Sequence, residues 1–148
     1  MFFPEIDREK TKSNARRKLR EYPRWRAVAQ DSVSQNVTAQ YTFEPRQALR
    51  EPSRAVERLA LNKTVADQEL EAIEQAVSRL FDPIHRRILY DKYLKTWPRP
   101  DVGIYTELGY ERSRYYEMLD NALIAFAEQY REASLVVEKR TNTGLIPD

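Results

Sequence analysis

Apolar side chains recur at intervals of three or four residues along several stretches of the chain, a spacing that predicts amphipathic helices. The first stretch is residues 7–29, where the repeating positions are Ala15, Leu19, Tyr22, Trp25 and Ala29. Pro23 falls inside this stretch. Because proline cannot donate a backbone hydrogen bond and clashes with the preceding turn, we expect a kink there or two shorter helices.

A longer apolar stripe runs through residues 53–80 and fits either one long helix or two helices joined at residues 61–64. Thr64 followed by Asp67 resembles a weak capping box, an arrangement of side chains found where helices begin, and therefore favours the break. A stripe of this length also indicates packing against another helix or against another copy of the chain.

The clearest helix start in the sequence is Asp82 followed by Pro83. Aspartate accepts hydrogen bonds from the first free backbone N–H groups of a helix, and proline fits the first helical position. The residues that then face the core are Ile84, Ile88 and Leu89. Pro98 and Pro100 end this helix, since neither can continue it, and we expect Asp101 to cap the next one.

Residues 101–120 fit a helix-turn-helix in register. Gly109 stands at the turn, where glycine adopts a left-handed backbone conformation without steric cost. Counting back eight residues puts the first position at Asp101, and the positions that must be buried are then Ile104, Leu108, Tyr110, Tyr115 and Met118. Two positions fit poorly, because Tyr105 stands where the helices cross and Glu111 caps a helix less well than serine or threonine. An ordinary helical hairpin with glycine at its bend is the alternative interpretation.

If this unit reads DNA, the exposed face of its second helix makes the contacts with the bases. That face comprises Arg112, Ser113, Tyr116 and Glu117, with Arg114 beside it. Arginine can bind guanine through two hydrogen bonds, and glutamate can accept one from cytosine. Residues 100–148 nevertheless hold five basic and nine acidic side chains, so attraction to phosphates must come from elsewhere. Basic residues just before the unit are the first candidates, namely Arg86, Arg87, Lys92, Lys95 and Arg99.

The other candidate source of positive charge is residues 1–30, which hold nine basic and four acidic side chains. A basic arm that contacts double-stranded DNA would include Arg16, Arg17, Lys18 and Arg20. The alternative is a solvated face of an amphipathic helix that seeks a partner surface. Because the unit alone carries little positive charge, we also expect a homo-oligomer, or a complex assisted by host RNA polymerase.

The overall composition favours an all-α protein, since glycine occurs only three times in 148 residues and helix-forming residues are common. The domain organisation we expect is a basic N-terminal helical segment (1–30), a polar linker (31–52), a helical domain (53–131) and a tail (132–148). The absence of cysteine excludes disulfides and thiolate metal sites, and His85 is the single histidine. No Gly-rich phosphate loop or cysteine nucleophile is present. We therefore expect no enzyme, no cofactor and no metal.

The sequence shows no signal-peptide pattern at its start and no apolar run near the roughly 20 residues of a membrane span. We therefore expect a soluble, cytoplasmic protein that does not contact membranes.

Two parts of the sequence together resemble the ArpU family of phage transcriptional regulators. One is "FFPEIDREKTKSNARRKLREY"; the other is "LFDPIHRRILYDKYL" with "DVGIYTELGYERSRYYEMLDNALIAFAEQYR". The pairing of "LGY-x-x-S-x-YY" with "FPEID" is the specific feature; the family usually carries serine at the position of Glu111. The resemblance implies a C-terminal unit similar to the fourth region of bacterial sigma factors. It also implies a phage-encoded regulator of late genes for lysis or packaging.

Two other functions fit the same residues. A helical adaptor in phage assembly or packaging would use residues 53–80 and the basic segment to oligomerise, and residues 101–131 to bind protein. The second alternative is a sigma-like unit that docks on RNA polymerase rather than on DNA.

Overall fold

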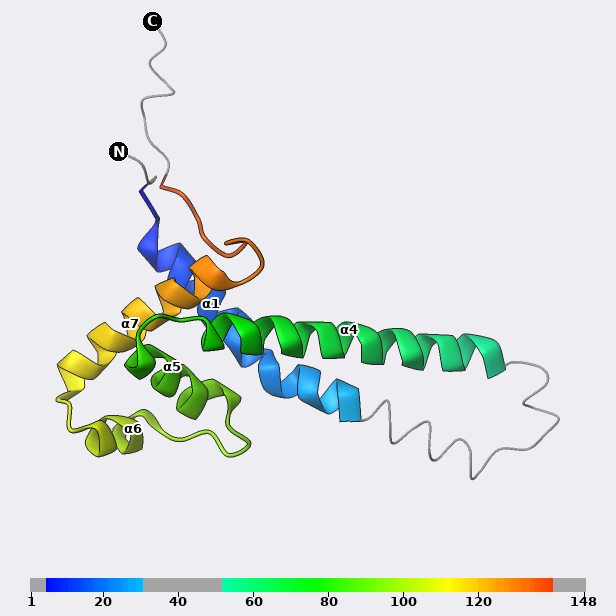
Figure 1. Ribbon diagram of the computed structural model, residues 1–148, viewed down its shortest axis with the longest axis horizontal. Coiled ribbons are helices and arrows are strands. Elements are labelled where there is room, and N and C mark those ends of the chain that lie inside the picture. The colour runs from blue at the N-terminus through cyan, green and yellow to red at the C-terminus, as the bar shows by residue number, and fades with distance from the viewer. Residues whose placement is uncertain (1–4, 31–51, 140–148) are drawn as a thin grey trace, which may run out of the picture.

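The computed structural model describes residues 5–30 and 52–139 (Figure 1). Its helices are α1 (Arg8–Arg20), α4 (Pro52–Ser78), α5 (Pro83–Leu89), the π-helical turn η1 (Tyr90–Leu94), α6 (Asp101–Leu108) and α7 (Arg112–Gln129). Residues 22–30 are helical as well. Over the described ranges there is no strand, and the one extended pairing is an isolated bridge between Ile6 and Glu138. The all-α prediction is therefore confirmed.

Two of the segments predicted from the sequence lie largely or partly outside this description. The polar linker at residues 31–52 is outside it except for Pro52, and so are residues 140–148 of the tail. None of the helices in the described ranges has the length and apolar character needed to cross a membrane.

The N-terminal helical stretch is divided in two at Glu21. The Asp7 carboxylate caps α1 by accepting a hydrogen bond from the Lys10 N–H at 3.1 Å. Glu21 closes α1 with a tight hydrogen bond from its N–H to the carbonyl of Lys18, and the chain is helical again from residue 22. Pro23 thus stands in the first turn of the second helix, where a missing N–H donor costs nothing. The expectation of two shorter helices is confirmed.

The expectation of a break near residues 61–64 is wrong, because α4 runs without interruption through 27 residues, about 40 Å at 1.5 Å per residue. The Asp67 carboxylate pairs at 2.9 Å with the ammonium group of Lys63, one turn earlier. It therefore supports a continuing helix instead of capping a new one. The later part of α4 reaches the core at Ile73 and Val77, whereas Leu61 and Val65 are 63% and 39% exposed.

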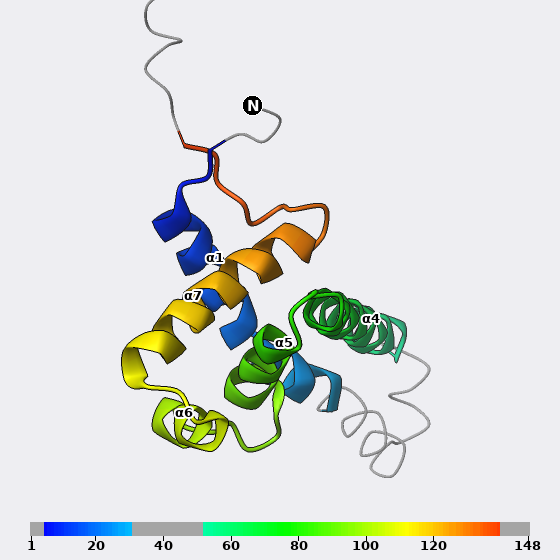
Figure 2. The same cartoon turned by 60° about the vertical axis from the view of Figure 1, so that its left-hand side comes forward.

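The core forms where α7 packs against α1, α5 and the end of α4, and Figures 1 and 2 show α7 lying across α1. Five side chains of α7 are completely buried: Tyr115, Ala122, Leu123, Phe126 and Ala127. On α1 the buried side chains are Thr11, Ala15 and Leu19, four residues apart. The amphipathic N-terminal helix therefore finds its partner surface within its own chain.

After α7 the chain turns back and follows the start of α1. Three consecutive residues, Arg131, Glu132 and Ala133, adopt positive φ angles of 41°, 57° and 61°. The N–H of Asp7 then donates to the carbonyl of Val137 at 2.7 Å, and the N–H of Val137 donates to the Thr11 hydroxyl at 3.0 Å. These bonds hold residues 135–139, part of the predicted tail, against the N-terminal end of α1.

Candidate nucleic-acid interface

The turn between α6 and α7 has the geometry predicted for it. Gly109 has φ 77° and ψ 22°, and its N–H closes α6 on the carbonyls of Tyr105 and Thr106. A Cβ placed on Gly109 would meet no atom within 4 Å, so the backbone conformation rather than lack of space demands glycine. This turn sets the direction in which α7 leaves α6.

The register predicted for the two helices is also confirmed. Ile104, Tyr115 and Met118 are buried, and Leu108 and Tyr110 are partly buried against the same core. The poorly fitting Tyr105 is accommodated where the helices meet, since its ring packs on that of Tyr115 with centroids 5.4 Å apart. Two tilted aromatic rings thus replace the small residue usual at such a crossing.

Asp101 is not the cap that the sequence suggested. Pro100 precedes α6 without a side-chain hydrogen bond, and Asp101 is the first helical residue. Its carboxylate instead accepts from the Tyr115 hydroxyl at 2.6 Å, the Lys92 ammonium at 2.8 Å and the Tyr116 hydroxyl at 3.2 Å. The charged ammonium of Lys92 and the hydroxyl of the fully buried Tyr115 outcompete the backbone N–H groups of α6 for this carboxylate, so the side chain turns toward α7.

These contacts shift the pKa values of Asp101 and Tyr115 in opposite directions. Burial by itself would raise the pKa of Asp101, but the hydrogen bonds from Lys92 and Tyr115 outweigh it, and the pKa lies below its usual value. Burial, and then the hydrogen bond to Asp101, raise the pKa of Tyr115. Asp101 is therefore an ionised link that holds α6 to α7.

The leading face of α7 is exposed as predicted, at Arg112, Ser113, Arg114, Tyr116 and Glu117. The Arg112 guanidinium lies 5.8 Å from the centroid of the Tyr116 ring, and Arg114 pairs with Glu117 at 2.9 Å. Exposed pairs of this kind contribute only about 0–1 kcal/mol, so a nucleic acid could replace them. Glu111 precedes α7 without a side-chain cap, which fits its predicted weakness in that role.

The three arginines predicted to flank the unit are engaged with the protein itself. Arg86 donates to the carbonyl of Leu80 at the end of α4, while Arg87 and Arg99 both bind the carboxylate of Glu107 in α6. The hydrogen bond from Arg99 is the main reason that the pKa of Glu107 is lowered. These side chains join α5 and the following loop to neighbouring helices, so a contact with DNA would have to displace Glu107 or a carbonyl. Their role in DNA binding stays a prediction.

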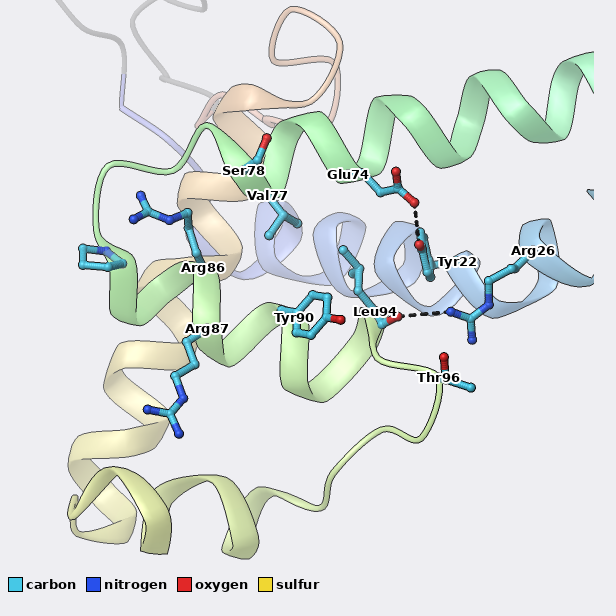
Figure 3. A pocket seen from close by; sticks show the side chains of 11 residues that line it. Tyr22, Arg26, Glu74, Val77, Ser78, Arg86, Arg87, Tyr90, Leu94 and Thr96 are labelled. Carbon is cyan, nitrogen blue, oxygen red and sulfur yellow. Dashed lines mark hydrogen bonds between the residues drawn. The ribbon is translucent and has the colours of Figure 1, made fainter.

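Arg86 and Arg87 also line a groove of about 690 Å³ between α4 and α5, shown in Figure 3. At its far side the Tyr22 hydroxyl donates to Glu74 at 2.6 Å, and burial together with this bond raises the pKa of Tyr22 to about 12. Arg26 donates to the carbonyl of Leu94 at 3.2 Å. The arginines and Tyr22 of this groove thus already have partners within the protein.

The predicted basic arm is divided between two sides of α1. Lys18 pairs with Glu21 at 2.9 Å and with the buried Glu69 of α4 at 3.3 Å. Arg16 and Arg20 lie on the opposite flank, where their charges reach Tyr93 of η1. Arg17 is exposed. The arm is therefore a packed helix, and only one flank of it turns toward α6.

Comparison with known proteins gives one clear relative. The chain is 47% identical over 141 residues to a protein of Streptococcus phage O1205 named "Putative autolysin regulatory protein ArpU", a match that covers 94% of this chain and all of the relative. This chain belongs to the ArpU family. Comparison with family models and with solved structures gives no match.

In this ArpU-family chain, two basic residues that the sequence did not single out lie beside the exposed face of α7. Arg8 donates to Asn121 at 3.1 Å, and Lys12 pairs with Asp120 at 3.3 Å. Both acceptors follow Glu117 by about one turn. No signal in the sequence pairs residues so far apart, because they meet only once α1 lies across α7.

The acidic side chains of this ArpU-family protein do not gather into a metal site. Among the described residues, no three histidine or acidic side chains are placed to share an ion. Asp91, Asp101 and Glu107 each bind lysine or arginine instead.

Proposed function

We propose that this protein is a sequence-specific DNA-binding regulator of transcription, in which α6, Gly109 and α7 form a helix-turn-helix similar to the fourth region of sigma factors. The observation that carries the proposal is the placement of Arg112, Ser113 and Tyr116. They occupy the exposed first turns of a helix whose later turns are buried in the core. A helix held in this way can enter the major groove with its N-terminal turns first.

The position of the unit within the fold supports this proposal. Figure 2 shows α6 and the start of α7 at the edge of the molecule, away from α4. A duplex could therefore approach the leading turns of α7 without meeting the long helix. The major groove, about 12 Å wide, admits one α-helix with its side chains.

The relative's name supports the regulatory part and indicates the target genes. That protein is named for autolysin regulation. We propose that this chain likewise regulates late phage genes, those for lysis or packaging, and is not an enzyme. Its action then lies in the choice of a DNA site.

The experiment that tests the proposal removes two arginines from the leading face of α7. Arg112→Ala with Arg114→Ala should weaken binding to the DNA around the protein's own gene, since each contact of this kind contributes about 1–3 kcal/mol, or about 5-fold to 150-fold in affinity. Binding is measured by gel retardation, with circular dichroism to verify the helical content.

A matched control carries Arg24→Ala with Arg79→Ala. These two exposed arginines lie on residues 22–30 and at the end of α4, so the variant loses the same charge from elsewhere. We expect it to bind like the wild type apart from a small general loss. Retardation of the specific fragment by the Arg112/Arg114 variant at the wild-type concentration would refute the assignment of α7 as the recognition helix.

A protein partner is the second element of the proposal, supported by exposed aromatic residues. Phe81 is 99% exposed and Trp97 is 83% exposed, on the two loops that flank α5 and η1. Large apolar side chains left in water commonly mark contact surfaces. We propose host RNA polymerase as this partner, and a pull-down with polymerase in the absence of DNA, comparing wild type with Trp97→Ser, tests it. Equal recovery of the wild type and the Trp97→Ser variant would show that Trp97 does not contribute to polymerase binding.

We also propose a homo-oligomer, because a second copy would double the contacts that a weakly basic unit makes with DNA. Light scattering of the purified protein, alone and with a DNA fragment of its own gene, tests this point.

A further inference from the structure

A crevice of about 490 Å³ separates α1 from the segment that leads into α6. Its charged lining side chains are Arg20, Lys92, Arg99 and Asp101, and Tyr93 and Pro100 are among its other walls. We refer to it as the α1–α6 crevice. Three cationic side chains against one carboxylate make it a place where an anion is favoured.

Arg20 is the cation in this crevice that is free to bind a ligand. It is exposed, and it forms no ion pair or hydrogen bond with any residue in the described ranges. Lys92, by contrast, already neutralises Asp101 at 2.8 Å, and Arg99 binds Glu107. The crevice thus has one unpaired guanidinium, while its own carboxylate is compensated.

Tyr93 contributes an unsatisfied polar group to the same place. The residue is only 6% exposed, and its buried hydroxyl lies near Arg16 but forms no hydrogen bond within the described part of the chain. A buried hydroxyl without a partner is unusual, because leaving it unpaired costs free energy. Because the hydroxyl oxygen is itself shielded from solvent, a phosphate oxygen in the crevice would become its acceptor after a small rotation of the side chain toward the crevice.

The start of α6 adds a third favourable feature. Pro100 lines the crevice and precedes α6 without capping it through a side chain, so the first N–H groups of α6 are open to a ligand. The positive end of the helix dipole favours an anion at this position.

The crevice also adjoins the proposed recognition face. Asp101 lines it and accepts a hydrogen bond at 3.2 Å from the hydroxyl of Tyr116, which lies on the leading face of α7. A ligand in the crevice would therefore lie next to a duplex bound by α7.

We propose that the α1–α6 crevice binds one backbone phosphate of the DNA that α7 reads, with Arg20 as the main cation and the Tyr93 hydroxyl as a hydrogen-bond donor. The proposal rests on the proposed function and adds to it the source of affinity that the acidic C-terminal part lacks. Phosphate contacts carry no sequence information but fix the register of a protein on the duplex. The crevice would thus set which bases Arg112 and Tyr116 face.

The test compares Arg20→Gln with Arg24→Gln, a matched control that removes the same charge from an exposed position four residues along the chain, outside the crevice and outside the predicted basic arm. Fluorescence anisotropy gives the affinity for the specific fragment and for a scrambled fragment between 50 and 200 mM salt. The affinity falls as salt rises, and each lost phosphate contact makes this fall less steep. For each bound copy we therefore expect Arg20→Gln to reduce the magnitude of the slope of log K against log salt by about 0.9. Arg20→Gln should weaken binding of both fragments alike, whereas Arg24→Gln should leave the slope at its wild-type value.

Tyr93→Phe tests the hydroxyl separately. Because it removes only an unsatisfied buried group, the free protein should melt at the same temperature or higher, while affinity for both fragments falls several-fold. An unchanged affinity for Tyr93→Phe, or an Arg20→Gln slope equal to that of the wild type, would overturn the crevice as a phosphate site.

The two proposals fail in distinguishable ways. If the wild type binds its own DNA specifically and the Arg112/Arg114 variant does not, but Arg20→Gln changes nothing, only the crevice is refuted. If the wild type shows no preference for its own DNA at any salt concentration, both proposals are refuted.

Discussion

Replacing Asp101 by alanine should destabilise the packing of α6 on α7, because the Asp101 carboxylate joins the two helices. The substitution removes the acceptor of the fully buried Tyr115 and the partner of Lys92. An orphaned buried hydroxyl costs about 1–3 kcal/mol, and a half-exposed ion pair adds up to about 1 kcal/mol. We therefore expect Asp101→Ala to lower the free energy of unfolding by about 1–4 kcal/mol.

Thermal unfolding followed by circular dichroism measures this loss. In a domain of this size, 1 kcal/mol shifts the melting temperature by about 4 °C, so Asp101→Ala should melt about 4–16 °C below the wild type. Asp101→Asn keeps an acceptor for Tyr115 and loses only the charge, so it should lose about 1 kcal/mol. A double-mutant cycle with Tyr115→Phe isolates the hydrogen bond itself.

The dependence on pH follows from the lowered pKa of Asp101. A carboxyl group whose pKa is lowered by folding stabilises the protein fully above its unfolded pKa, about 4, and loses that effect as the pH falls through the folded value. The difference in melting temperature between wild type and Asp101→Asn should thus be constant from pH 8 to 5 and shrink below about pH 4. A shift under about 2 °C for Asp101→Ala would refute the link between α6 and α7.

Three further substitutions test other parts of the fold, all by thermal unfolding. Gly109→Ala should destabilise by about 1–2 kcal/mol, since alanine must adopt the left-handed conformation of this turn, and a loss under about 0.5 kcal/mol would contradict the geometry. Ala133→Gly should stabilise the protein by about 0.5–1 kcal/mol, because glycine adopts the φ of 61° at this position more readily than alanine. The control Ala125→Gly lies within α7 and should destabilise the protein, so the two changes in melting temperature must have opposite signs. Glu69→Ala should cost about 3 kcal/mol, because it leaves Lys18, Tyr130 and Arg131 without a common acceptor, and a wild-type melting temperature would exclude that role.

Features set by neighbours in the sequence were predictable. Asp82 accepts the Ile84 N–H at 2.8 Å at the start of α5, and Gly109 is left-handed, each as a local rule requires. The burial of Tyr115 and Met118 followed from the register counted from Gly109. Such rules act over one or two turns, so they need no knowledge of the fold.

The wrong predictions concern side chains that fit a local capping pattern but bind another partner in the folded protein. Asp101 satisfies a capping pattern, yet the buried Tyr115 and the cation of Lys92 bind its carboxylate more strongly. Asp67 likewise fits a capping box but pairs with Lys63 inside a continuous helix. The contacts of Arg8 and Lys12 with α7 depend on the crossing of two helices, which no pattern within either helix encodes.

The packing of α1 on α7 also decides how the basic N-terminal residues must be tested. Residues 1–30 carry more basic than acidic side chains, while residues 100–148 carry the reverse. The structure brings one flank of α1 beside the acidic unit, so the two charge distributions act on the same surface. Yet Ala15, Leu19 and Tyr22 belong to the core, and deleting the segment would expose the buried face of α7. Loss of DNA binding after such a deletion would report unfolding as readily as lost contacts. Single substitutions at exposed positions such as Arg20 and Arg17 are therefore the informative experiment, because they change charge and leave the core intact.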